Sequence, residues 1–309
     1  MNDKPGTIRL DFLSELKKTL ADPLFLCIAA ALLLAVVTAI ILLVRKKRKR
    51  TRSAVNIAVA NVHGIGGRDS QQDAFAVSSL SDAELFKSRG VLAVLADGMG
   101  GMSFGSEISG IVVASMMEAF QRGDVPESPG DTLMRLVRLA DEKVADFLGG
   151  HANSSGGSTV VAVIVKDKAL DYISVGDSRV CLIRDGRMET LCRAHNYGTE
   201  LDELAQKGVY TAEYAAAHPY RHALTSFIGI KDLNKIDRSF RSISIRPGDR
   251  VLLMSDGVFN TLSDDRIVKC MKPDIYASAD ALEKAVMNEK APDQDNYTAV
   301  LIDCSPKNY

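Results

Sequence analysis

Short apolar runs rich in Val and Ile alternate with turn residues from residue 53 onward, and this pattern predicts β-strands. The runs lie at 55–62, 73–79, 91–96, 158–166, 170–175, 179–184, 250–255 and 297–302. Several are separated by only a few residues, for example by Asp167-Lys168 or Asp185-Gly186. Gaps that short permit hairpins but no helical crossover, so these strands should pair antiparallel.

Apolar residues at a spacing of three and four predict helices between these strands. The predicted helices are 104–121, 131–148, 199–207, 211–217, 264–271 and 278–289. Hairpins combined with paired amphipathic helices are typical of an α+β layered domain and not of a doubly wound parallel sheet. About 250 residues suffice for one such domain.

A different pattern precedes the domain: the 21 residues 24–44 carry no charge, and seven of the next eight are Lys or Arg. A helix of that length is about 31 Å long, enough to cross a hydrocarbon core of about 30 Å. Basic residues beside a span favour its cytoplasmic side. We therefore expect an extracytoplasmic tail at 1–23, one transmembrane helix at 24–44, a polybasic linker at 45–53 and a cytoplasmic domain at 54–305. The predicted location is the cell membrane.

Other interpretations of this N-terminal region exist. A cleaved signal peptide would need a basic start, a shorter apolar core and a small-residue cleavage site, which the sequence lacks. A buried helix of a globular protein would rarely lack every charge over this length. The basic block could be a nuclear signal, but directly after an apolar span it is more typical of a stop-transfer signal that contacts lipid headgroups. Residues 7–20 fit either a short interfacial helix or a solvated tail.

Charge and composition exclude several classes of protein. Residues 53–309 contain 27 basic and 35 acidic side chains, and the whole chain has no Trp and only 6% aromatic residues. An acidic body with few stacking groups is not typical of a nucleic-acid-binding protein, so we expect no nucleic-acid partner. The five cysteines are scattered without a CxxC pair, which argues against a disulfide framework and a cysteine zinc site.

Aspartates recur at the ends of the predicted strands. They are Asp73, Asp97, Asp177, Asp256 and Asp295. Each alone is more typical of a turn or a helix cap. Several buried aspartates that converge need cations, and ligands that are all oxygen favour Mg²⁺ or Mn²⁺ over zinc. The set therefore predicts a divalent metal site.

Taken together and in this order, the motifs resemble the metal-dependent serine/threonine protein phosphatases, the PPM or type 2C family, in its bacterial-type branch. The resemblance covers about residues 54–303. It rests on Gly66-Gly67-Arg68, Gln71-Gln72-Asp73-Ala74-Phe75, Asp97-Gly98-Met99-Gly100-Gly101, Gly105, Glu107, Gly157-Ser158-Thr159, Gly176-Asp177-Ser178-Arg179, His218-Pro219, Leu224-Thr225, Gly229, Ser255-Asp256-Gly257 and Asp295-Asn296-Tyr297-Thr298.

The resemblance implies a core site for two Mn²⁺ or Mg²⁺ ions. Asp97 would bridge both ions, with the Gly98 carbonyl on one of them. Asp256 and Asp295 would complete the other, and Asp73 would hold metal-bound waters.

The resemblance also assigns roles outside this core. Asp177 would help to bind a third, weaker ion, and Arg68 would bind the substrate phosphate, so that Arg68, Asp73 and Asp97 are the predicted catalytic residues. The implied fold is two stacked antiparallel β-sheets with helices on both outer faces, an α-β-β-α sandwich. Residues 190–245 would contain a variable flap beside the site.

The chemistry follows from the ions. Two dications lower the pKa of a shared water, which can then attack the phosphorus of phosphoserine or phosphothreonine without a covalent intermediate. The expected partners are phosphorylated protein substrates of a Ser/Thr kinase, and membrane lipids through the span and the basic block. Three departures from the family pattern, at Gln72, Met102 and Ala194, leave an alternative: a catalytically weak, phosphatase-like module that binds phosphoproteins at the membrane.

Overall fold

The computed structural model describes residues 23, 26–27, 31–39, 55–99, 104–123, 127–150 and 156–306. The chain divides into two compact units, Met1–Ser53 and Ala54–Tyr309. In the first unit, Leu26, Cys27 and residues 31–39 are helical and exposed. The remainder of the predicted span, residues 7–20 with their two alternative interpretations, and the basic block at 45–52 lie outside the described residues. Within the described ranges, no helix is long and apolar enough to cross a membrane.

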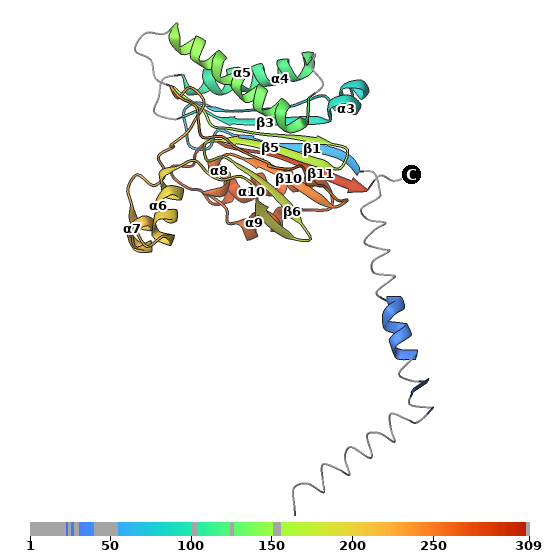
Figure 1. The fold of residues 1–309 in the computed structure, drawn as a ribbon. Helices are drawn as coiled ribbons and strands as arrows, with labels where there is room; N and C mark the ends of the chain where they lie inside the picture. Colours follow the sequence, from blue (N-terminus) through green and yellow to red (C-terminus); the bar gives the residue numbers. More distant parts are fainter. Residues whose placement is uncertain are drawn as a thin grey trace, which may run out of the picture. The chain divides into compact units, whose positions relative to one another are not determined.

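The second unit contains two antiparallel sheets (Figure 1). The first sheet has the strand order β1 (Val55–Gly64), β11 (Tyr297–Pro306), β10 (Asp249–Met254), β6 (Arg179–Arg184) and β7 (Arg187–Thr190). The second has the order β2 (Asp73–Val77), β3 (Val91–Asp97), β4 (Val160–Lys166), β5 (Ala169–Val175) and β8 (Asp237–Arg238), and β9 (Ile243–Ser244) also pairs with β5. The pairings of these strands are antiparallel, as the short gaps predict.

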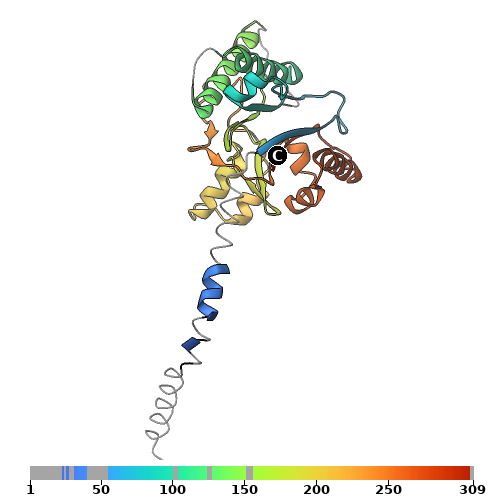
Figure 2. The same ribbon diagram turned by 90° about the vertical axis from the view of Figure 1, so that its right-hand side faces the viewer.

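Helices cover both outer faces of this sandwich (Figures 1 and 2). On the second sheet lie α4 (Gly105–Arg122) and α5 (Pro129–Gly149), with α3 (Ala83–Arg89) beside β4. On the first sheet lie α8 (Asp256–Phe259), α9 (Asp264–Cys270) and α10 (Ile275–Asn288), and α6 (Tyr197–Gln206) and α7 (Ala212–Ala217) follow β7 in the chain. The predicted α+β sandwich is therefore confirmed.

Alternating side chains of the central strands build three apolar layers. In β3, Leu92 and Val94 pack with the helices of the second sheet, whereas Ala93 and Leu95 point between the sheets. The inner layer from the first sheet includes Val251, Leu253, Val300 and Ile302. Because both faces of each central strand are buried, their sequences are continuous apolar runs. In β3 and β4, polar side chains are therefore displaced to the strand ends, and Asp97 lies at the end of β3.

Candidate metal centre

Asp73 and Asp97 are direct neighbours across the β2–β3 ladder. Asp73 opens β2 and Asp97 closes β3, so both lie at one edge of the second sheet. The backbone N–H of Asp97 donates to Thr159 Oγ1 at 3.2 Å, which fixes the end of β3 against β4. Two carboxylates in such a register repel each other unless a cation or a proton intervenes.

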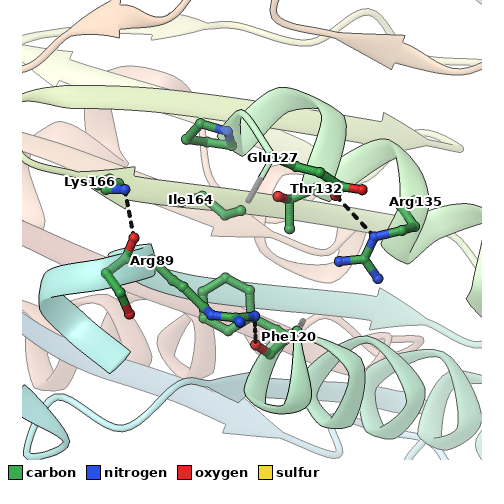
Figure 3. A pocket seen from close by; sticks show the side chains of 10 residues that line it. Arg89, Phe120, Glu127, Thr132, Arg135, Ile164 and Lys166 are labelled. Atoms are coloured by element: carbon green, nitrogen blue, oxygen red, sulfur yellow. Dashed lines mark hydrogen bonds and ion pairs between the residues drawn. The ribbon is translucent and has the colours of Figure 1, made fainter. Parts of the chain in front are cut away.

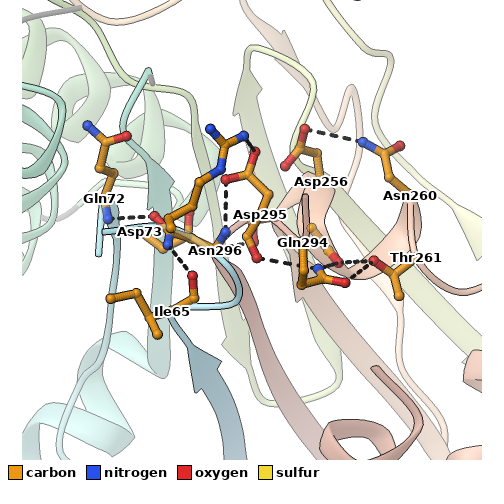
Figure 4. Close-up of polar contacts among 12 residues, drawn as sticks. Ile65, Gln72, Asp73, Asp256, Asn260, Thr261, Gln294, Asp295 and Asn296 are labelled. Carbon is orange, nitrogen blue, oxygen red and sulfur yellow. Dashed lines mark hydrogen bonds and ion pairs between the residues drawn. The ribbon is translucent and has the colours of Figure 1, made fainter. Parts of the chain in front are cut away.

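Two hydroxyls connect Asp73 to the other sheet. Ser255 and Thr298 each donate to Asp73 Oδ2 at 2.7 Å. Ser255 directly precedes Asp256, and Thr298 follows Asp295 by three residues. Aspartates at the ends of both sheets are thereby drawn to one place (Figure 4). The sequence analysis assigned no role to these hydroxyls, although each lies in a motif beside one of the aspartates.

Asn296 joins the loops that carry Arg68 and Asp295. Its Oδ1 accepts from the backbone N–H of Gln72 at 2.8 Å. Its Nδ2 donates to the carbonyls of Ile65 and Ser70 at 2.8 and 3.1 Å (Figure 4). This nearly buried amide is thus a structural clamp, and the sequence analysis did not single it out.

The pKa values of Asp97 and Asp256 are raised by burial and by neighbouring carboxylates. Burial, and then four neighbouring carboxylates, raise the pKa of Asp97 well above its usual range; the four belong to Asp73, Asp256, Asp177 and Asp295. Burial, with carboxylates that include Asp177 and Asp295, raises the pKa of Asp256 to about 7. A bound cation would relieve this repulsion, because a nearby opposite charge favours the ionised form.

Asp177 and Gly98 complete the predicted set. Burial raises the pKa of Asp177, and its neighbour Ser178 is joined to Thr159 by a hydroxyl contact of 2.7 Å. The N–H of Gly98 donates to the carbonyl of Gln72 at 3.0 Å. A Cβ at Gly98 would lie 2.2 Å from the Gly105 carbonyl oxygen, so the close approach of these two segments requires glycine. Gly100, Gly101 and Met102 of the same loop lie outside the described residues.

Arg68 lies at this centre but contacts another predicted site residue. Its Nη2 donates to Asp295 Oδ2 at 2.8 Å, and both side chains are about half exposed. The guanidinium that was predicted to bind phosphate therefore occupies a carboxylate that was predicted to bind metal. This contact joins residues 227 positions apart and has no local sequence signal.

The donor set fits a hard divalent cation. Asp73 Oδ1 is buried and has no hydrogen-bond partner among the described residues, an arrangement that calls for a cation or a bound water. As the described side chains stand, no group of three His, Cys, Asp or Glu is placed to hold a metal ion. Three of the aspartates accept hydrogen bonds from other side chains. Arg68 donates to Asp295, Asn260 donates to Asp256 at 3.2 Å, and the two hydroxyls donate to Asp73 Oδ2. Binding therefore requires rotation of side chains that are already gathered.

A cavity of about 300 Å³ elsewhere in the domain has a different character (Figure 3). Its cationic side chains form hydrogen bonds or ion pairs with nearby groups. Arg89 donates to the Phe120 carbonyl at 2.8 Å, Lys166 to the Ser88 carbonyl at 2.6 Å, and Arg135 pairs with Glu127. The first two stabilise helix C-termini, so we assign this cavity a structural role.

Comparison with known proteins agrees with the geometry. The family model for protein phosphatase 2C matches residues 65–293. A putative protein phosphatase 2C-type of Streptococcus pyogenes is 30% identical over 214 residues, which are 68% of this chain and 85% of that protein. The serine/threonine protein phosphatase PstP of Mycobacterium tuberculosis is 30% identical over 227 residues, 71% of this chain but 41% of that protein.

Solved structures are similar as well. A crystal structure of the PstP catalytic domain in complex with two manganese ions superposes with a TM-score of 0.63 at 25% identity, and the match covers 82% of this chain and 99% of that one. The match in sequence, the shared sandwich and the gathered aspartates lead to one conclusion. The chain belongs to the protein phosphatase 2C family and is a serine/threonine protein phosphatase.

Proposed function

We propose that the domain hydrolyses phosphoserine and phosphothreonine in proteins with a metal-activated water. The family is metal-dependent. The observation that carries the proposal for this chain is the register that pairs Asp73 with Asp97, together with the hydrogen bonds that join Asp73 to Ser255 and Thr298 of the other sheet. Burial, and then neighbouring carboxylates, raise the pKa of Asp97 and Asp256. Such a cluster is stable in its ionised form only when cations neutralise it.

The chain's own residues have distinct tasks in this proposal. Asp97, Asp256 and Asp295, with the Gly98 carbonyl, would hold two Mn²⁺ or Mg²⁺ ions, and Asp177 would help to hold a third. When bound, the ions lower the pKa of water and neutralise charge on the phosphoryl group.

Asp73 orients water through Oδ1, since its Oδ2 is occupied by two hydroxyls. Arg68 releases Asp295 and donates to the phosphate oxygens, which a planar guanidinium suits. The pairing with Asp295 keeps the guanidinium beside the centre until substrate arrives.

The test is phosphate release from a phosphothreonine peptide with Mn²⁺, with and without chelator. Asp256→Asn should lower turnover by at least about a hundredfold. Asp265→Asn, in an exposed aspartate of α9, is the matched control and should retain activity. Chelator-insensitive turnover, or full activity of Asp256→Asn, would exclude the proposed site. Phosphopeptide binding without turnover would instead support the weak binding module.

We also propose that a single N-terminal span anchors this enzyme in the cell membrane with the domain in the cytoplasm, where it acts on substrates of a Ser/Thr kinase. The support is the uncharged run at 24–44 and the basic block that follows. Protease added to intact spheroplasts should leave residues 54–309 undigested. Digestion of the domain would reverse the orientation, and recovery of the full chain in the supernatant after lysis would exclude the anchor.

A further inference from the structure

The connection between β8 and β9 presents an apolar side chain to solvent. Phe240 is 94% exposed, more than any other large apolar side chain among the described residues. The guanidinium of Arg241 lies 5.9 Å from the centre of its ring. Burial of an exposed phenyl ring is favourable. A binding partner that covers Phe240 would therefore gain free energy.

This tip is held in place from below. Asp171 of β5 is buried and accepts hydrogen bonds from the hydroxyls of Ser239 at 3.3 Å and Ser242 at 3.0 and 2.9 Å. The Ser239 N–H also donates to the Tyr172 carbonyl at 3.0 Å. Both ends of the Phe240-Arg241 tip are thus hydrogen-bonded to the sheet, and the ring points outward. Because the tip is already ordered, binding would cost little conformational entropy.

The charge around the tip is positive. Residues 237–246 contain Arg238, Arg241 and Arg246 against one acidic residue, Asp237, and the Nε of Arg246 is buried. Arg238 lies 3.7 Å from Asp131 of α5, whereas Arg241 has no ion pair with any described residue. The exposed ring of Phe240 beside the guanidinium of Arg241 matches an anionic lipid interface, because the ring enters the boundary region while the guanidinium group meets a headgroup phosphate.

The chain's geometry allows this contact. Ten residues, 45–54, separate the predicted span from β1, and they reach at most about 36 Å. The register also places the tip toward the end of the domain where β1 begins. Ile243 and Ser244 pair with the start of β5, Gly248 donates to Cys304 at 2.7 Å, and Cys304 pairs with Ile57 of β1.

We propose that the Phe240-Arg241 tip is a second membrane contact, which docks the phosphatase domain on anionic lipid. The contact extends the proposed anchor but does not require it, since the tip's own chemistry recognises the bilayer. Docking would hold one side of the domain against the membrane and so limit which substrates reach the metal centre.

The absence of Trp from the chain makes a sharp test possible. In the full chain, Phe240→Trp is a single fluorescent reporter of the tip, and Tyr276→Trp is the control on α10, whose parent side chain is 63% exposed. Each variant is mixed with or reconstituted into phosphatidylcholine vesicles, with and without phosphatidylglycerol. Flotation of the same samples reports the anchor separately.

We expect the Phe240→Trp emission to shift to shorter wavelength, and to be quenched by brominated acyl chains, only with anionic vesicles. In the Phe240→Trp background, Arg241→Gln should lower the affinity of the tip for anionic vesicles about fivefold. Tyr276→Trp should not respond. Unchanged Phe240→Trp emission with anionic vesicles would overturn the proposal, as would a shift that occurs without lipid and indicates a protein contact. Failure to float with neutral phosphatidylcholine vesicles, together with a retained emission response to anionic vesicles, would reject the anchor and keep the tip contact.

Discussion

Arg68 Nη2 lies 2.8 Å from Asp295 Oδ2, so the residue assigned to the substrate phosphate shares a contact with a residue assigned to metal. If Asp295 holds a metal ion as proposed, the guanidinium and the ion compete for the same carboxylate oxygen. We expect Arg68→Gln to raise the apparent Mn²⁺ affinity about two- to fivefold, which corresponds to the free energy of a typical exposed ion pair. The same change should raise KM for a phosphopeptide at least about tenfold.

Isothermal titration with Mn²⁺ and steady-state kinetics separate these two effects. Arg122→Gln is the control, because Arg122 forms an exposed ion pair with Glu118 on α4. Weaker Mn²⁺ binding in Arg68→Gln would contradict the competition.

The hydroxyl of Thr298 should adjust the acidity of Asp73. Burial raises the pKa of Asp73, and the hydrogen bonds from Thr298 and Ser255 lower it again. Thr298→Val removes one of these donors at nearly constant volume, so the pKa of Asp73 should rise further. Because the ionised carboxylate favours metal, Mn²⁺ binding should be lost at a higher pH than in the parent chain. A pH series of Mn²⁺ titrations measures this, with Thr132→Val on α5 as the control.

Gly66 and Gly67 provide a matched pair of substitutions. Gly66 has φ +63°, and a Cβ there would lie 2.2 Å from the Asp295 carbonyl oxygen. Gly67 has no such strain, and its Cβ would meet the Pro292 carbonyl at 3.3 Å. Gly66→Ala should therefore displace the Asp295 loop, lower stability by about 1–3 kcal/mol and weaken Mn²⁺ binding. Equal Mn²⁺ affinities for Gly66→Ala and Gly67→Ala would show that this approach does not position Asp295.

Stability without metal should fall as the pH rises. The pKa of Asp256 is raised from 3.8 to about 7 in the folded protein, so between these values the folded state keeps a proton that the unfolded chain releases. The free energy of unfolding in chelator should therefore decrease from about pH 4 to about pH 7. Denaturant unfolding at a series of pH values measures the slope. Asp256→Asn should make the slope shallower, because the raised pKa values of Asp73, Asp97 and Asp177 remain, and Mn²⁺ should restore stability at pH 7. A rising slope in chelator would contradict the assignment.

Long apolar runs made the main strands and helices predictable. The strands at 91–97, 160–166 and 249–254 and the helices α4 and α5 appear within two or three residues of their predicted bounds. The predictions missed shorter elements, because two residues carry no periodicity: β8 and β9 exist only through their pairing with β5. Helix α3 buries no residue and therefore shows no apolar stripe.

The site was only partly accessible from the sequence. Aspartates at strand ends suggested a metal site, but Asp73 and Asp295 are far apart in the chain, and only the resemblance to a family placed them together. The hydroxyls of Ser255 and Thr298, the amide of Asn296 and the Arg68–Asp295 pair depend on tertiary contacts between distant segments, which no local pattern encodes.

The two stacked sheets have a consequence for how this enzyme can change. Asp97 belongs to the second sheet and Asp256 to the first, and the layer of Ala93, Val163, Leu253 and Val300 lies between those sheets. The bulk of these interior side chains sets the spacing of the sheets, and with it the separation of the two carboxylates. Substitutions in this layer can therefore change the separation of Asp97 and Asp256 without altering either carboxylate.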